Sequence, residues 1–546
     1  MGGHRKKKAA GLAGILLAGL CLWGCSGEDS EQPENRENKE NFVSVTLFVD
    51  VDFWHAPRWD TAEGTITGDI SRHTGLVIAP VERLKNPARQ LSLMLVNDEL
   101  PDVITVTDET VRSQLVSSGK VWKLDEFLET YMPDSHLLET YPEDILYELE
   151  KRDGGWYALP SHIISQDAVK IWKPSSECYE ELFLYEDPKT IFWNRALLEK
   201  LGLRAEDLST EQKLFEAFDL ARKNGIQPLM IDGDSWYETT FPMLADRYGA
   251  EYVDGEGNYT DILQQQEAKE ALRFLNRAVR EGYMDSGQLT MSNDELEQKV
   301  LGGNVLCFMG NMANISFDSR EWIASGPLEI EGKTPVWGKN MRASTGWMNT
   351  FVSKDCSHPE EIAAWLDYMT SSEGMMRWCW GEEGVDYLME DGLVYLTEEG
   401  VAATMDSEES GVSAWWMFNN AAWERSVRTP FKEGTLAEAE AEAKTAYASD
   451  PRVKAYDLSL VSDLLAGLPE NHRYRALEEQ IENWKEEQVA QVVLAENDGE
   501  FEAEYARLQE GLLERGIREL NEFKNEQYKK NCQEYGRVIE SVNPDA

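Results

Sequence analysis

The stretch VSVTLFVDVDFW at residues 43–54 begins with a predicted strand. Residues 43–49 are rich in β-forming side chains and contain no glycine or proline, which indicates a buried strand. A polar helical segment and a short strand at 76–79 follow, and an amphipathic helix at 86–96 leads to the strand VITV at 103–106. Strands and helices that alternate at this spacing predict α/β units.

The same alternation returns in the middle of the chain. Strands are predicted within IFWNRALLEKLGL, GIQPLMI and GGNVLCFMG, with helices at 213–223 and 267–280. Ser357 and Glu360 have the spacing of a capping box at the start of a further predicted helix. From Leu436 onward strand signals largely disappear, and the charged segments that follow predict a helical C-terminal region.

The N-terminus has the layout of a secretion signal. Basic residues 5–8 precede an apolar run at 9–23, which is shorter than the roughly 20 residues of a membrane span. The run ends in LWGC at 22–25, which resembles the lipobox of bacterial lipoproteins and predicts a diacylglycerol on Cys25. Residues 26–41 are acidic and polar, and such a segment cannot bury enough apolar surface to fold. A plain signal peptide with an incidental cysteine is the alternative.

The net charge of the chain limits the classes of partner that it can bind. The formal net charge is −47, and removal of the basic signal makes the mature chain more acidic still. Such a charge argues against nucleic acid and other anionic partners. It also disfavours phosphorylated, sulfated or uronate-rich ligands, unless a local cluster of arginines overrides the field.

Chemical motifs are sparse. The chain contains no H-E-x-x-H, G-x-S-x-G or phosphate-binding loop, and the cysteines beyond Cys25 are scattered, without a C-x-x-C. The segment DGEGNYTDILQQ, from Asp254, alternates like the start of a calcium loop, but Tyr259 and Gln265 stand where glycine and glutamate are needed. We therefore predict a hairpin there, and no metal site.

Several segments, taken in order, resemble one family. They are VSVTLFVDVDFW, LMLVNDELPDVI, VWKLDEFLETYMPD, IFWNRALLEKLGL, GGNVLCFMGN, GWMNTFVSKDCSHPEEIAAWLDYMTSSEGMMRWCWGEEGVDY and YARLQEGLLERGIRELNEFKNEQYKK. Together they are similar to an extracellular solute-binding protein of family 1. They resemble more closely its long, lipid-anchored branch, found beside sugar ABC importers in Gram-positive bacteria. The similarity covers essentially the whole mature chain, and it rests on the ordered set, because no single segment is specific.

The resemblance implies an α/β, two-lobed fold of the periplasmic-binding-protein-like type II, with a hinge and a helical C-terminal region. The chain is expected to cross between the lobes near 157–161, near 346–352 and after Gly384. The implied division is a signal peptide at 1–24, the lipidated cysteine and a disordered linker at 25–41, an N-lobe at 42–157 and 349–385, and a C-lobe with the C-terminal helices at 158–348 and 386–546.

Candidate ligand contacts follow from the rule that sites in α/β lobes form outside the carboxyl ends of strands. Residues 52–54 and 107–109 follow strands in that way, and family members place ligand contacts at both positions. A tryptophan ring can stack on the apolar face of a sugar, although a single tryptophan is more often a core residue. Adjacent Trp415 and Trp416 cannot easily both be buried on one helix face. The candidate residues are Trp54, Asp108, Glu109, His162, Trp236, Asn311, Trp347, Trp415 and Trp416.

The resemblance implies a substrate-binding protein of an ABC importer, which captures an oligosaccharide in an interlobe cleft. Its expected partners are the oligosaccharide and the permease subunits, with the membrane reached only through the lipid anchor on the extracytoplasmic face. We expect a monomer without catalytic residues, cofactor or nucleic acid. Two alternatives stay open: a surface-anchored glycoside hydrolase or lyase, and a binding protein for another solute such as a peptide.

Overall fold

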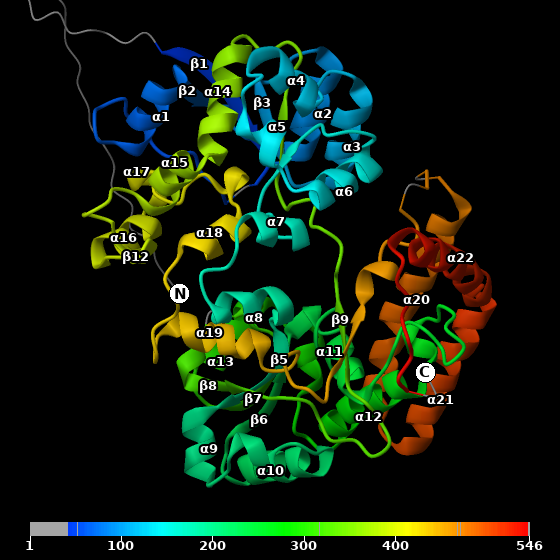
Figure 1. Cartoon of the computed structure of the whole chain (residues 1–546). Helices are drawn as coiled ribbons and strands as arrows, with labels where there is room; N and C mark the ends of the chain where they lie inside the picture. Colours follow the sequence, from blue (N-terminus) through cyan, green and yellow to red (C-terminus); the bar gives the residue numbers. More distant parts are fainter. Residues whose placement is uncertain (1–41, 52, 316, 467, 470, 544–546) are drawn as a thin grey trace, which may run out of the picture. The chain divides into compact units, whose positions relative to one another are not determined.

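The computed structural model describes residues 42–51, 53–315, 317–466, 468, 469 and 471–543. The predicted signal peptide, Cys25 and the acidic linker lie outside this part of the chain. Two larger β-sheets, each with its own helices, organise the described residues (Figure 1).

The first sheet has five strands in the order β2-β1-β3-β10-β4. Its strands are β1 (Val43–Val49), β2 (Leu76–Pro80), β3 (Val103–Val106), β10 (Asn349–Val352) and β4 (Leu159–Pro160). β1 pairs in parallel with β2 and β3, whereas β10 runs antiparallel to β3 and β4. The strand predicted at 43–49 is confirmed, and a segment far away in sequence, β10, completes the sheet.

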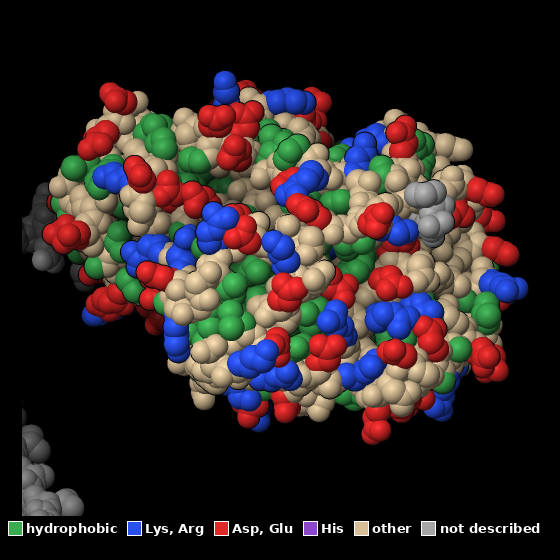
Figure 2. Space-filling model, turned by 90° about the horizontal axis from the view of Figure 1, so that it is seen from below, with side chains coloured by type: hydrophobic (Ala, Val, Ile, Leu, Met, Phe, Trp, Pro, Cys, Tyr) green, Lys and Arg blue, Asp and Glu red, His purple; other side chains and the backbone are tan. Residues whose placement is uncertain are grey.

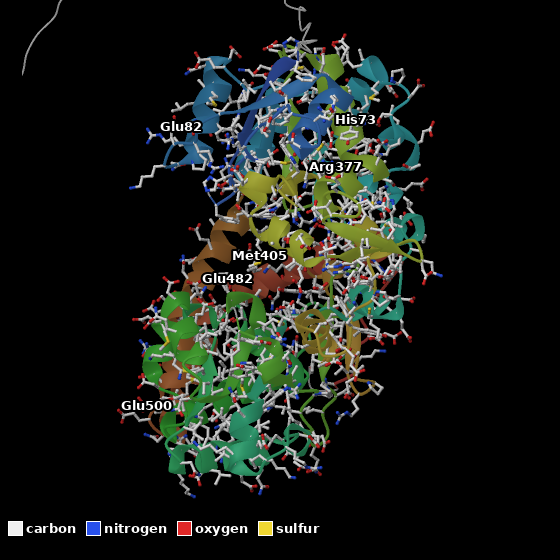
Figure 3. The ribbon with its side chains drawn as sticks, turned by 90° about the vertical axis from the view of Figure 1, so that its left-hand side faces the viewer. His73, Glu82, Arg377, Met405, Glu482 and Glu500 are labelled. Atoms are coloured by element: carbon white, nitrogen blue, oxygen red, sulfur yellow. The ribbon has the colours of Figure 1, made fainter. Side chains whose placement is uncertain are left out.

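Helices surround this sheet. They are α1 (Ile66–Thr74), α2 (Pro87–Asn97), α3 (Glu109–Ser118), α4 (Leu124–Tyr131), α5 (His136–Thr140), α6 (Glu143–Asp153), α7 (Gln166–Ile171), α14 (Pro359–Thr370) and α15 (Ser372–Met375). α1 packs against the segment around α14: the Nε of Arg377 lies 2.6 Å from a carboxylate oxygen of Asp69, and His73 stacks on Tyr368. Figure 3 labels His73 and Arg377.

The start of α14 differs from the prediction. Its N-cap is His358, which makes no side-chain cap, and Pro359 takes the first helical position. The backbone N–H of Ser357 donates to a carboxylate oxygen of Asp102 instead, at 2.8 Å. The capping box predicted from Ser357 and Glu360 is therefore wrong, because a residue distant in sequence satisfies this turn.

The first lobe extends further along the chain than the boundary predicted at residue 385. Trp415, Phe418 and Trp423 belong to the same hydrophobic core as the strand residues of the first sheet. The hairpin of β11 (Tyr387–Glu390) and β12 (Leu393–Leu396) and the helices α16 (Glu398–Met405), α17 (Ser407–Ser410) and α18 (Ala421–Val427) fall within this segment. Large aromatic side chains thus tie residues 386–427 to the first sheet.

The points at which the chain crosses between the lobes therefore also differ from the prediction. The packing of the chain changes lobes between Trp172 and Tyr179, between Trp337 and Ala343, and between Val427 and Phe431. The first and third changes come later in the sequence than predicted, and the second comes slightly earlier.

The second sheet has four strands in the order β6-β7-β5-β8. They are β5 (Lys189–Asn194), β6 (Gln227–Ile231), β7 (Val305–Asn311) and β8 (Trp322–Ala324), with β6 and β7 parallel and β5 antiparallel to both β7 and β8. Its helices are α8 (Glu177–Tyr185), α9 (Arg195–Leu201), α10 (Glu211–Lys223), α11 (Thr240–Tyr248), α12 (Gln266–Arg280), α13 (Asn293–Leu301) and α19 (Leu436–Thr445). A separate parallel pair, β9 (Val336–Lys339) and β13 (Lys454–Asp457), borders this lobe.

The predicted helical C-terminal region is present. It consists of α20 (Arg473–Leu494), α21 (Asp498–Glu514) and α22 (Ile517–Tyr535), in orange and red in Figure 1. Gly516 separates α21 from α22 with a φ of 90°, a conformation that glycine adopts without steric cost. The Asn276 amide of α12 donates to the carbonyls of Val493 and Ala495, which fastens α20 to the second lobe.

The hairpin predicted near Asp254 can also be compared with the structure. Val253 and Tyr259 form a bridge, and Asp254 accepts hydrogen bonds from the backbone of Glu256 and Asn258, so the predicted hairpin is confirmed. All cysteines within the described ranges are free thiols. None of the helices described is both long and apolar enough to cross a bilayer. On the face shown in Figure 2, acidic and basic side chains are interspersed.

Candidate functional site

Three aromatic rings from distant segments meet at the surface. Phe53 follows β1, Trp347 precedes β10, and Trp416 begins a short 3-10 turn, Trp416–Phe418. Phe53 is 65% exposed and Trp347 is 42% exposed. Their ring centroids lie 6.4 Å apart with an interplanar angle of 14°, and Trp416 lies 6.0 Å from Phe53 and 6.5 Å from Trp347. We call these three residues the aromatic cluster.

Local backbone geometry turns these rings outward. Gly346 has a φ of 83°, and a Cβ there would lie 2.4 Å from the Cβ of Pro160, so only glycine fits before Trp347. Trp416 is half-buried, and its indole N–H donates to the carbonyl of Ser413 at 3.1 Å. Ser413 itself has a φ of 57°, in the left-handed region.

His162 lies at the edge of the aromatic cluster. Its ring is 5.4 Å from that of Trp347 in an edge-to-face arrangement, and its backbone N–H donates to the carbonyl of Asn419 at 2.6 Å. The ring Nδ1 is 2.7 Å from the Oγ of Ser161. Burial lowers the pKa of His162, so the imidazole is neutral at neutral pH.

Three of the predicted tryptophans lie in the core. Trp54 is 3% exposed and donates its indole N–H to the carbonyl of Ala414, Trp236 is 5% exposed, and Trp415 is fully buried. Trp415 packs edge-on against Trp59 and Trp365. Trp236 and Trp415 line neither of the grooves described below, so we do not carry them into the candidate site, whereas Trp54 contributes to the lining of the first groove. Phe53, and not Trp54, is the exposed ring that follows the first strand. Its position just beyond the end of that strand is the sequence feature that could have identified it as a site residue.

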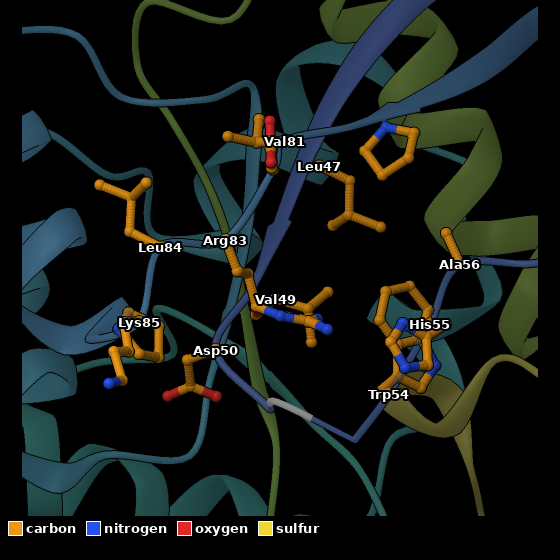
Figure 4. A pocket seen from close by; sticks show the side chains of 13 residues that line it. Leu47, Val49, Asp50, Trp54, His55, Ala56, Val81, Arg83, Leu84 and Lys85 are labelled. Carbon is orange, nitrogen blue, oxygen red and sulfur yellow. Dashed lines mark hydrogen bonds between the residues drawn. The ribbon is translucent and has the colours of Figure 1, made fainter. Parts of the chain in front are cut away.

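A first groove, with a volume of about 830 Å³, lies at the ends of β1 and β2. Its lining includes Asp50, Trp54, His55, Arg83 and Lys85. The side chain of Arg83 extends past Val49 toward Trp54 and His55 (Figure 4). Charged side chains and apolar ones such as Val49 thus line this space together, and Trp54 in its lining is the neighbour of Phe53 in the chain.

The carboxylate of Asp50 ties the first groove to the start of α3. It accepts hydrogen bonds from the backbone N–H groups of Thr107 and Asp108, at 2.7 and 3.1 Å, and from the Thr107 hydroxyl. Burial raises the pKa of Asp50, and these bonds oppose that shift. Asp108 and Glu109 are exposed, and Asp108 caps α3 through the backbone of Val111. The two predicted acidic residues thus lie beside the groove without lining it.

A second groove, with a volume of about 640 Å³, joins segments of both lobes. We call it the cationic groove because its charged lining residues are Lys189, Lys339, Arg342 and Arg425, against Glu186, Asp187 and Glu238. Asn311 lines it, and its side-chain oxygen accepts from the backbone of Ala313. Ser344 and Ile164, also in the lining, stand close in sequence to Trp347 and His162.

The described part of the chain was also searched for side chains that could bind a metal ion. No group of three or more histidine, cysteine, aspartate or glutamate side chains there is arranged to hold a metal ion. The described residues offer exposed aromatic rings and two grooves with charged side chains in their linings, and this arrangement can hold an elongated ligand with apolar faces and polar edges.

The sequence profile of the bacterial extracellular solute-binding proteins matches residues 84–376, more than half of the chain. This chain belongs to the bacterial extracellular solute-binding protein family. The membership of this family that the sequence resemblance implied is thereby confirmed.

Relatives of this solute-binding protein are distant in sequence. The polygalacturonan/rhamnogalacturonan-binding protein YtcQ of Bacillus subtilis strain 168 is 21% identical over 420 residues, which cover 73% of this chain and 76% of the relative. A solute-binding protein from Bifidobacterium longum infantis, described as HMO-binding and associated with an ABC transporter, shares 15% identity with a TM-score of 0.62, over 89% of this chain and 99% of its own.

The substrate-binding protein FusA of S. pneumoniae, solved with kestose, is 16% identical with a TM-score of 0.62. That alignment covers 90% of this chain and all of FusA. These likenesses confirm the two-lobed α/β fold of this solute-binding protein.

Proposed function

We propose that this protein captures an oligosaccharide against the aromatic cluster and delivers it to an ABC importer. The observation that carries the proposal is the exposure of Phe53 and Trp347. Large exposed rings cost free energy in water unless a partner covers them. The C–H face of a pyranose is such a partner. The polar groups of the two grooves can donate hydrogen bonds to the sugar hydroxyls or accept hydrogen bonds from them.

The ligands named for similar proteins support the saccharide class. YtcQ is named for polygalacturonan and rhamnogalacturonan, one structural neighbour is described as HMO-binding, and FusA was solved with kestose. In the proposed role the protein performs no chemistry on the sugar. The ligand acts by binding one arrangement of the lobes more tightly than another, and the permeases recognise that arrangement.

A screen of purified ligands tests the saccharide class. Thermal melting of the mature protein is measured with neutral oligosaccharides, acidic oligosaccharides and peptides of similar length. A true ligand at about 100 times its Kd stabilises the protein by about 2.7 kcal/mol. Stabilisation by a peptide and by no saccharide contradicts the proposal, and release of shortened sugars during incubation favours a glycoside hydrolase or lyase.

We also propose that the mature protein is anchored through a lipid on Cys25, on the extracytoplasmic face of the membrane. The motivation is the basic residues at 5–8, the apolar run and the LWGC sequence at 22–25. In a Gram-positive host fed labelled palmitate, wild-type protein should carry label and sediment with membranes. Cys25→Ser should lose both properties. If that variant keeps label and membrane association, the anchor lies elsewhere.

A further inference from the structure

We infer that the cationic groove binds the carboxylate of a uronosyl residue, so that the oligosaccharide is acidic. This inference deepens the proposed function and rests on it. It concerns Lys189, Lys339 and Arg342, three cations that line the same groove from different segments.

Lys339, at the end of β9, has the strongest geometry for an anion. Its ammonium donates to the carbonyls of Phe183 and Leu184, at 3.2 and 2.8 Å. Among the described residues no carboxylate lies within ion-pair distance of this ammonium, which also lies 5.1 Å from the centroid of the Phe183 ring. An ammonium has three donors, and the two carbonyls use two of them. The third donor and the uncompensated charge remain for a ligand in the groove.

Lys189 and Arg342 add to this charge. The Lys189 ammonium, at the start of β5, makes no ion pair or side-chain hydrogen bond with the residues that the structure covers, although it acts through space on the buried carboxyl of Asp246. The guanidinium of Arg342 donates to the carbonyl of Ser459 at 3.0 Å, and its ion pair with exposed Asp463 is long, at 3.9 Å. Lys189 and Arg342 therefore add two positive charges to the lining of the groove, and nearby carboxylates neutralise these charges only weakly.

The acidic residues of the groove are partly neutralised already. Glu186 lies 2.8 Å from Arg425 and 3.3 Å from Lys444. Burial acts to raise its pKa, but these two cations hold the pKa of Glu186 below its usual value, so it stays ionised and paired. Asp187 accepts the backbone N–H of Lys189 at 3.0 Å. The lining carries four cations against three acids, in a chain whose formal charge is −47.

Screening decides which charges a ligand experiences. At physiological ionic strength the Debye length is about 8 Å, so most of the acidic surface acts weakly on a group inside the groove. Lys189, Lys339 and Arg342 line the groove itself. The overall acidity that disfavours uronates at the level of composition is therefore overridden locally.

The position of the groove favours a sugar acid over a free anion. Ser344 lines the cationic groove, and Trp347 of the aromatic cluster follows it closely in the chain. A uronosyl residue carries its carboxylate on the pyranose ring itself. One saccharide can therefore present a ring face to the aromatic cluster and a carboxylate to the cations.

Matched ligands test this inference by titration calorimetry on the mature protein. The probes are trigalacturonate, its methyl ester, which has the same rings without charge, a sulfated galactose trisaccharide and inorganic sulfate. Trigalacturonate should bind at least about tenfold more tightly than its ester, because charge-assisted hydrogen bonds are lost on esterification. Equal affinity for acid and ester overturns the inference. If the sulfated trisaccharide or inorganic sulfate binds more tightly than trigalacturonate, the assignment of the groove to a carboxylate is overturned.

Variants locate the effect. Lys189→Gln and Lys339→Gln should each reduce the preference for acid over ester by about tenfold and leave the affinity for the ester unchanged. Lys200→Gln, on the exposed face of α9, is the matched control and should keep the full preference. Because Lys339 also holds two carbonyls, its variant is judged with its melting temperature, and Lys189→Gln gives an independent result. If neither variant changes the preference, the carboxylate binds elsewhere and the inference fails.

The same titrations separate this inference from the proposed function. Tight binding of neutral saccharides without preference for the acid overturns the inference alone. Binding of no saccharide in the panel, acidic or neutral, overturns the proposed function and the inference together.

Discussion

The aromatic cluster and the cationic groove are two recognition surfaces of different kinds. The aromatic cluster presents uncharged rings, of which Phe53 and Trp347 are the most exposed. The cationic groove presents the ammonium groups of Lys189 and Lys339 and the guanidinium of Arg342. Ring stacking depends on the apolar face of a sugar, which neutral and acidic sugars share. Cations distinguish a carboxylate from a hydroxyl or an ester.

This difference suggests a division of labour. The aromatic cluster should supply most of the affinity for any suitable saccharide, and the cationic groove should supply selectivity for the acidic ones. The two contributions respond differently to truncation, salt and pH, so each can be changed without the other.

The largest expected effect tests whether the exposed rings bind ligand or support the fold. Trp415→Ala should lower the free energy of unfolding of the first lobe by about 3–5 kcal/mol, because a fully buried indole leaves a cavity. Trp416→Ala should cost much less, since its ring is half-buried. Thermal melting of the ligand-free variants measures this. Equal losses from both substitutions would place Trp416 in the core and remove it from the aromatic cluster.

The next effect concerns affinity. Trp347→Ala and Trp416→Ala should each weaken binding by about 2 kcal/mol, or roughly thirtyfold in Kd, for trigalacturonate and its methyl ester alike. Met405→Ala is the control, because Met405 is 85% exposed on α16 and lines neither groove (Figure 3). Calorimetry gives both affinities. A loss confined to the acidic ligand contradicts the division of labour.

Salt sharpens the comparison with a smaller effect. Affinity for trigalacturonate should be highest near 0.1 M salt, where the Debye length is about 10 Å and local cations dominate. It should fall several-fold near 1 M, where the length is about 3 Å, and also near 0.01 M, where repulsion from the whole acidic chain extends to about 30 Å. The methyl ester should show neither decline. Parallel salt curves for the two ligands would argue that charge plays no part.

The smallest expected effect is the titration of His162 at the edge of the aromatic cluster. Burial lowers the pKa of His162 in the folded protein. The neutral imidazole therefore contributes to the free energy of unfolding above the unfolded pKa of about 6.5, and this contribution is lost as pH falls through the lowered folded value. The melting temperature of the wild type relative to His162→Asn should therefore decline between about pH 7 and pH 5. Asparagine tolerates the φ of 55° at this position. A constant difference across this range contradicts a buried neutral imidazole.

Much of the secondary structure could be predicted from local sequence. The strands at 43–49 and 103–106 and the helix ending at Lys223 follow from runs and periodicities within short windows. Glycines such as Gly75 end helices by a local rule. The family resemblance was likewise readable, because it depends on the order of such segments along the chain.

The capping of α14 and the lobe boundary could not be predicted in this way. Ser357 has the right spacing to Glu360, yet the carboxylate of Asp102 holds its backbone N–H. Residues 386–427 join the first lobe because Trp415 and Trp423 pack into its core. Both outcomes depend on partners that are distant in sequence.

The sequence by itself determined the α/β class, the succession of strands and helices, the family and the presence of tryptophan beyond the strand ends. Only the tertiary structure decided that Trp415 is buried while Trp416 meets Phe53 and Trp347, and that Lys189, Lys339 and Arg342 line one groove in an acidic chain. The physical reason is that secondary structure depends on neighbours within a few residues. Burial and local charge depend on side chains that only folding brings together.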